Sequence, residues 1–177
     1  MRPVIPFASA AMALPVAFAN TNAGSKLWIC AEPQQIGLDK DDFEALDWVQ
    51  VKAVGSHGET GSTTNILTYD TWDTDVTQKA KGITDAGSPD IELARLPNDP
   101  GQDALRAAAA TNLNYAFKIE RNDKPNTNAA SKPTTIYNLG LVTGPRRPMG
   151  RNEDFDLETF TLGLNQREIV VDPIAVA

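Results

Sequence analysis

The stretch ALDWVQVKAVGS, residues 45–56, alternates apolar and polar residues, and this alternation decides the fold class. Val49, Val51 and Ala53 fall on one face of an extended chain, and the polar residues between them fall on the other. A period of two is typical of an antiparallel strand with one face in a core and one face in water. The stretch therefore predicts a half-buried β-strand.

Three later segments repeat the alternation: YAFKIER at 115–121, IYNLGLVT at 136–143 and ETFTLGLN at 158–165. Threonine and aromatic residues, which favour strands, are frequent in them. The side chains expected to point inward are Tyr115, Phe117, Ile119, Tyr137, Leu139, Leu141, Phe160, Leu162 and Leu164. Clusters of Gly, Pro, Asn and Asp separate the segments and indicate turns. We therefore expect a mainly β fold, a sandwich or a barrel.

One segment, NDPGQDALRAAAATN at 98–112, breaks this pattern. Asp99 suits the N-cap, Pro100 suits the first helical position, and the alanines that follow are strong helix formers. The segment predicts one helix over about residues 100–111 that flanks the sheet. A weaker helical turn is indicated in DKDDFEALD, where Asp39 or Asp41 would be the cap.

Composition limits the chemistry that this chain can perform. Its 177 residues suit one domain, and 16 Lys and Arg against 23 Asp and Glu give a net charge of −7, which disfavours a tight grip on nucleic acid. One cysteine, Cys30, excludes an internal disulfide, and one histidine, His57, leaves too few ligands for an ordinary zinc site. We expect no catalytic residues, no metal and no cofactor.

The acidic run YDTWDTDVTQKAKGITDAGSPD, residues 69–90, resembles a metal loop only superficially. A calcium loop needs oxygen ligands at alternate positions, a glycine at the bend and a closing glutamate. Asp70, Asp73 and Asp75 are spaced three and then two apart, and neither the glycine nor the glutamate follows. The run is more typical of a solvated face.

The N-terminus, MRPVIPFASAAMALPVAFANT, leaves three interpretations open. Its apolar run before Ala17-Phe18-Ala19 imitates a secretory signal, although three prolines interrupt it. Met12 offers an alternative start, and the whole segment suits an extended arm. We divide the chain into an arm over residues 1–23 and a single β domain over residues 24–177, and the role of residues 1–11 stays open. The prolines also make a membrane span a poor interpretation.

Two polar clusters in the sequence are candidates for a binding site. The glycine-rich GSHGETG, residues 55–61, lacks the Gly-Lys-Ser/Thr ending of a phosphate-binding loop and suits the mobile tip of a long hairpin, Val51–Tyr69. Arg146, Arg147 and Arg151 form the one basic cluster, which is either a solvated turn or an anion or partner contact.

Several motifs in order resemble the major tail tube protein of long, non-contractile phage tails. They are WVQVKAVGSHGETGSTTNILTYD, then KGITDAGSPDIELARLPNDPGQDALRAAA, and finally FDLETFTLGLNQREIVV. The middle block carries Lys81, Gly82, Asp85, Gly87, the expected strand Asp90–Leu96 and the helix start Asp99, Pro100, Gly101 and Gln102. The resemblance covers roughly residues 24–172.

The resemblance implies a tail-tube β-barrel whose hexameric rings stack into a hollow tube that conducts the genome into the host. Expected partners are other copies of the chain, a tape-measure protein, and tail terminator and tip proteins, with DNA passing without sequence-specific binding. The expected location is the virion, after assembly in the host cytoplasm. Alternatives are a tube protein of a bacterial secretion or tail-like particle, or a secreted β-sandwich binding module if the N-terminus is a signal.

Residue roles follow from the same resemblance. The residues expected to clamp neighbouring rings as a hairpin tip are Ser56, His57, Gly58, Glu59, Thr60 and Gly61. The candidates for an acidic channel lining are Asp70, Asp73, Asp75, Asp85 and Glu92. If residues 70–76 are extended, Asp73 and Asp75 share a face.

Overall fold

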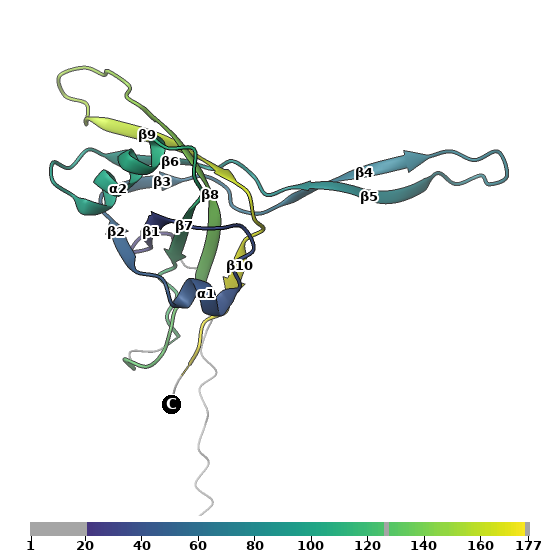
Figure 1. Ribbon diagram of the computed structural model, residues 1–177, viewed down its shortest axis with the longest axis horizontal. Coiled ribbons are helices and arrows are strands. Elements are labelled where there is room, and N and C mark those ends of the chain that lie inside the picture. Colours follow the sequence, from purple (N-terminus) through teal and green to yellow (C-terminus); the bar gives the residue numbers. More distant parts are fainter. Residues whose placement is uncertain (1–20, 126–127, 176–177) are drawn as a thin grey trace, which may run out of the picture.

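The structure, a computed structural model, describes residues 21–125 and 128–175 (Figure 1). The signal-like segment, Met12 and nearly all of the predicted arm lie outside the described residues. The elements follow in the order β1 (Lys26–Pro33), α1 (Lys40–Glu44), β2 (Trp48–Val51), β3 (Val54–His57), β4 (Thr63–Tyr69), β5 (Gln78–Asp85), β6 (Asp90–Ala94), α2 (Pro100–Ala109), β7 (Tyr115–Glu120), β8 (Thr135–Arg146), β9 (Leu157–Leu164) and β10 (Ile169–Val171). The predicted mainly β fold with a helix near residues 100–111 is confirmed.

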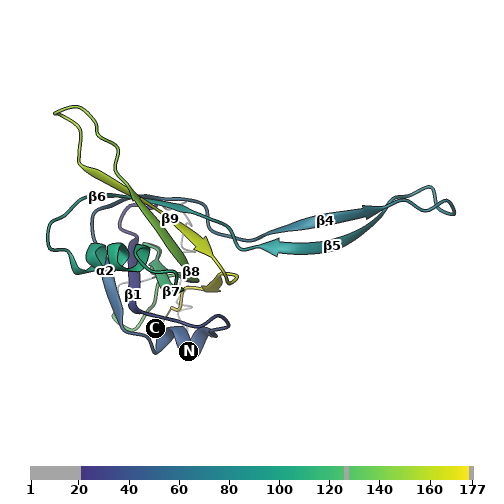
Figure 2. The same cartoon turned by 45° about the horizontal axis from the view of Figure 1, so that its top comes forward.

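Eight strands form one antiparallel sheet in the order β2-β1-β7-β8-β9-β6-β3, with β10 added beside β8. The strands at the two ends of this order, β2 and β3, are consecutive in the chain. Between them Ala53 adopts a positive φ of 56°, and its carbonyl accepts a bond from Ala94 N at 2.9 Å. The predicted strand is therefore bent in two, and its halves join the two ends of the sheet into a barrel, from which β4 and β5 project (Figure 2).

The barrel interior holds the main core, to which all strands of this order except β3 contribute buried residues, together with α2. Its buried residues are Leu27, Ile29, Val51, Ile91, Leu93, Leu105, Ala108, Tyr115, Phe117, Val142, Phe160, Leu162 and Leu164. Val54 of β3 packs against this core while remaining half-buried. The expected inward positions on β7 and β9 are thus correct.

A second core lies on the opposite face of the sheet. Phe43 of α1, Tyr137 and Leu139 of β8, and Ala116 of β7 are buried there. The prediction for β8 is therefore corrected: Tyr137 and Leu139 face α1 and not the barrel interior. Because β8 is covered on both faces, its sequence does not show which of its apolar residues face the barrel interior.

The short helix α1 confirms the weaker helical prediction. Asp39 is its N-cap and accepts a bond from Asp42 N at 2.9 Å, while Asp42 Oδ2 accepts one from Asp39 N at 3.1 Å. This reciprocal pair is a capping box, in which two otherwise unpaired donors are satisfied. The cap fixes the helix so that Phe43 covers the outer face of the sheet.

The start of α2 explains the motif Asp99-Pro100-Gly101-Gln102. Asp99 Oδ2 accepts a bond from Gln102 N at 3.1 Å, which caps the helix, and Pro100 occupies the first helical position. At Gly101 a Cβ would lie 2.2 Å from the carbonyl oxygen of Gln50 on β2. The helix therefore needs glycine there in order to approach the sheet so closely.

Gln102 has no exposed surface, and its side chain links the chain after β2 to β6, the neighbour of β3. Its Nε2 donates to the carbonyl oxygens of Lys52, after β2, at 3.0 Å and Ala94, in β6, at 2.9 Å. Its Oε1 accepts from Leu96 N at 3.0 Å. A buried amide with its groups satisfied stabilises the arrangement, whereas apolar replacement would leave backbone groups unpaired.

The close approach at Gly101 predicts that Gly101→Ala lowers the free energy of unfolding by about 1–3 kcal/mol, because the new methyl meets backbone atoms that cannot rotate away. Urea unfolding followed by tryptophan fluorescence measures the change. Gly163→Ala is the matched control, since its Cβ would meet only Leu141 Cβ at 4.0 Å. Equal stability of the two variants would contradict this account of the motif.

Candidate functional site: the projecting hairpin

Strands β4 and β5 form a separate two-stranded sheet that extends away from the barrel (Figure 1). They pair antiparallel from Thr63↔Asp85 near the barrel to Tyr69↔Gln78 at the far end. An isolated two-stranded hairpin is marginally stable in water. This hairpin therefore lacks the packing that the other strands receive from the barrel.

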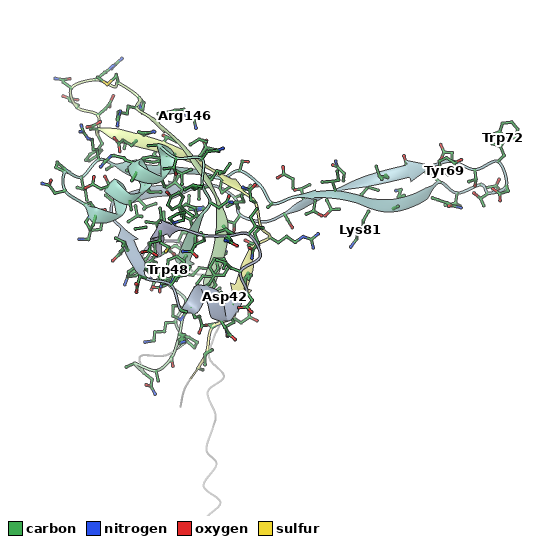
Figure 3. All side chains as sticks on the ribbon, viewed as in Figure 1. Asp42, Trp48, Tyr69, Trp72, Lys81 and Arg146 are labelled. Atoms are coloured by element: carbon green, nitrogen blue, oxygen red, sulfur yellow. The ribbon has the colours of Figure 1, made fainter. Side chains whose placement is uncertain are left out.

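The hairpin carries six of the thirteen large apolar side chains that are exposed in the described part of the chain. They are Ile66, Leu67, Tyr69, Trp72, Val76 and Ile83, and each is at least 60% exposed. Figure 3 shows Tyr69 and Trp72 at the end farthest from the barrel. Contiguous exposed apolar surface of this kind marks an interaction site.

The two faces of the hairpin differ in charge. Ile66 pairs with Lys81 and Thr68 with Lys79, so one face carries two lysines. On the other face Leu67 pairs with Ala80 and Tyr69 with Gln78, and none of these four is charged. Directly paired residues point to the same side of a sheet. The hairpin thus presents one basic face and one neutral, partly aromatic face.

The tip of the hairpin, residues 70–77, carries Asp70, Asp73 and Asp75 around the fully exposed Trp72. Its backbone forms turns, and the hydroxyl oxygens of Thr71 and Thr74 lie 2.8 Å apart across it. Because residues 70–76 are not an extended strand, the expectation that Asp73 and Asp75 share one strand face is wrong.

The predicted hairpin position is also corrected. Ser56 and His57 belong to β3 and pair with Glu92 and Ile91 of β6, while residues 58–61 lead to the base of the hairpin. Gly58 serves close packing, since a Cβ there would lie 2.9 Å from Asp90 N. The glycines suggested a turn, but the reversal lies in the acidic run, where apolar alternation stops between β4 and β5.

The remaining channel candidates lie apart from the tip. Asp85 ends β5 at the hairpin base, and its Oδ1 accepts a bond from Gly87 N at 3.0 Å. Glu92 lies between the buried Ile91 and Leu93 on β6, so it points to the outer face of the barrel, opposite Thr159 of β9. The five candidates therefore do not form one surface within a subunit.

Two of the three arginines in the basic cluster, Arg146 and Arg147, form ion pairs within the subunit. Arg146 Nη2 lies 3.0 Å from Asp90 Oδ2, and Arg147 Nε donates to Glu158 Oε1 at 2.8 Å. Glu158, which has no exposed surface, also accepts bonds from Arg106 at 2.8 and 3.0 Å. Burial alone raises the pKa of Glu158, but the two arginines outweigh burial, and the pKa lies below its usual value. Sequence patterns missed this acid because a lone glutamate in a strand gives no sign of burial.

A cavity of about 640 Å³ lies between β3, the start of β1, the end of β7 and the start of β8. Half-buried His57 is part of its lining, and His57 Nδ1 lies 2.8 Å from Gly58 O. A carbonyl only accepts, so Nδ1 carries the proton of the neutral ring. Burial lowers the pKa of His57 from 6.5 and outweighs the effect of this hydrogen bond.

Within the described residues, no group of three or more His, Cys, Asp and Glu side chains is placed to hold a metal ion. The same part of the chain contains no helix with the length and apolarity needed to cross a membrane.

Comparison with solved structures identifies the architecture. The sheath and tube terminator of an extracellular contractile injection system, PVC, in its extended state aligns at a TM-score of 0.62 and 10% identity over 88% of this chain and 99% of that chain. The tail tube protein of phage SPP1 aligns at 0.58 and 16% identity over 85% and 78%. The tube terminating cap of the anti-feeding prophage aligns at 0.55 and 13% identity over 92% and 99%.

No protein-family model matches the sequence, and a search of curated proteins finds no significant match. Identities of 10–16% indicate a shared fold. The chain therefore has the tail-tube fold, and the resemblance noted in its motifs is confirmed at that level.

The lowered pKa of His57 predicts a pH-dependent stability. Above pH 6.5 the ring is neutral in both states, but below it the unfolded chain binds a proton more readily than the folded chain. The free energy of unfolding therefore falls as pH drops from about 7 toward the lower folded pKa. Urea midpoints at pH 7.5 and 5.5 measure this fall, which should be smaller in His57→Gln. An equal fall in both proteins would show that another group is responsible.

Proposed function

We propose that this chain is the structural subunit of a phage tail tube, in which hexameric rings stack into a hollow conduit for the genome. The observation that carries the proposal is a closed barrel of the tail-tube fold with one hairpin projecting unpartnered from it. The apolar side chains of that hairpin gain stability only when another surface covers them, at about 25 cal/mol per Å² buried.

The hairpin β4–β5 acts as the contact between rings, the role that the sequence suggested for residues 56–61. A surface that projects from one side of a subunit and binds a different surface of the next is a heterologous contact. Heterologous contacts form a ring when the rotation closes and a filament when it does not, so an inter-ring contact that does not close lets the rings stack without limit. Ser56 and His57 contribute by holding β3 against β6, which fixes the direction in which the hairpin leaves the barrel.

The outer face of β6, β9 and β8 lines the bore in this proposal. Glu92, Thr159, Thr161 and Thr143 lie on it. A weakly acidic, hydroxyl-rich wall repels phosphate, whereas a basic wall would hold DNA by releasing counterions. Glu92 remains a channel candidate, and the tip aspartates belong to the contact between subunits instead.

The partners follow from the tube. Copies of the chain form the wall, a tape-measure protein occupies the bore during assembly, and terminator and tip proteins bind the ends. DNA passes without sequence-specific binding. The tube is part of the virion and assembles in the host cytoplasm. No catalytic step belongs to this role.

A tube terminator is the second candidate, because two injection-system neighbours with terminating roles align over 99% of their own length. A terminator caps a tube on one side and does not continue it. The two candidates differ in solution: a tube subunit adds rings without limit as concentration rises, whereas a terminator stops at one ring. Negative-stain microscopy of the purified chain over a range of concentrations distinguishes them.

Replacing residues 66–81 by a two-residue Asn-Gly turn should yield a folded chain that forms no tubes. The main core is untouched, so the circular dichroism of the barrel and its cooperative unfolding should persist. Microscopy and sedimentation should then find single subunits or single rings. Tubes of normal length from this variant would remove the hairpin from assembly.

The variant Glu92→Lys tests whether the outer face of β6, β9 and β8 lines the bore. Tubes should still assemble, because Glu92 forms no ion pair within the described residues, but DNA release should slow, and more so at low salt, where screening is weakest. Glu153→Lys, the same change of charge in the exposed loop between β8 and β9, is the control. Ejection rates that are equal in both variants at every salt concentration would reject the bore assignment.

A further inference from the structure

The cavity beside β3 has apolar lining and carries more positive than negative charge. Leu27, Val54, Ile119 and Ile136 supply the apolar lining, and the exposed charged residues are Lys26 and Arg121 against the single acid Glu59. Neither cation forms an ion pair within the described residues. An opening of this kind suits an apolar group flanked by negative charge.

The hairpin tip has that chemistry. Trp72 is fully exposed, and Asp70, Asp73 and Asp75 surround it. A tryptophan side chain buries roughly 150–250 Å² when it is enclosed. The cavity of about 640 Å³ offers apolar lining for it. Aspartates on either side would then face Lys26 and Arg121, so the two surfaces are complementary in apolar character and in charge.

The tip cannot enter the cavity of its own subunit. Gly58, Glu59 and Thr60 line the cavity and lead directly to the base of the hairpin. The seven residues of β4 alone hold the tip roughly 23 Å farther out, since a strand rises about 3.3 Å per residue. A cavity at the base and its complement at the tip can therefore meet only between two copies.

We propose that the tip of one copy, residues 70–77, inserts into the cavity of another copy, with Trp72 against the apolar lining and its aspartates on Lys26 and Arg121. This inference rests on the proposed role of the hairpin in assembly and specifies the surface that receives it. The contact joins two different surfaces, so each copy can both insert and receive, and the array stays open at its ends.

Charge exchange tests the contact. Asp73→Lys and Arg121→Glu should each raise the critical concentration for tube formation about tenfold, because each places like charges in the contact. The double variant should recover most of the loss. Trp72→Ala should raise the critical concentration about thirtyfold, as removal of a central anchor does. Arg151→Glu, a reversal in the exposed loop between β8 and β9, is the control and should have little effect.

Crosslinking distinguishes failure of this inference from failure of the proposed function. In tubes assembled above the raised critical concentration expected without the Trp72 indole, Trp72→Cys combined with Thr60→Cys should give a ladder of disulfide-linked copies on oxidation, and each single variant should give none. Normal tubes without a ladder, or tubes indifferent to both charge reversals, would overturn the cavity as the receptor while leaving the hairpin in assembly. Tubes formed by the hairpin-replaced chain would instead overturn the proposed function.

Discussion

The buried side-chain amide of Gln102 is the interaction on which the rest of this fold depends. It bonds to the carbonyl oxygens of Lys52, directly after the end strand β2, and Ala94, on β6 beside the other end strand β3. A twisted sheet curls but need not close, so a polar group that binds near both ends of the sheet favours the barrel over an open sheet. The amide reaches both carbonyls only because Gly101 allows α2 to approach β2, and Asp99 orients the first turn. The four consecutive residues 99–102 thus act together to stabilise the closed barrel.

Closure of the barrel determines where the hairpin lies. Because β2 and β3 occupy the two ends of the sheet order, the chain between β3 and β6 does not pair with this sheet and leaves the barrel as a separate hairpin. Strands inside the barrel satisfy their backbone groups and bury apolar side chains, whereas β4 and β5 satisfy only each other. The stability of the barrel therefore supports a segment that is unstable alone, and this segment is available to bind a second copy.

The sequence predicted a segment correctly where a single pattern, such as period-two alternation or a helix cap, described it. Strands β7 and β9 and the helix α2 followed from periodicity and capping, because each places its large apolar side chains on the main core. Predictions failed where a residue serves two purposes. Tyr137 and Leu139 were placed in the wrong core because β8 is covered on both sides, and Gly58 suggested a turn although it serves close packing. The hairpin tip was missed because three aspartates were interpreted as a channel surface, and the reversal between β4 and β5 lacks the glycine or proline that usually indicates one.

The charge pattern of the hairpin also determines which assemblies it disfavours. Two hairpins packed together on their basic faces would bring Lys79 and Lys81 of both copies into one contact, and two tips brought together would oppose six aspartates in total, three from each copy. Like charges at an interface cost several kcal/mol, so symmetric pairing of hairpins is disfavoured. Lysines on an exposed strand also limit uncontrolled edge-to-edge aggregation. What remains favourable is a contact with a surface of different composition on another copy. In the proposed tube, the same charges therefore favour head-to-tail contacts over symmetric ones.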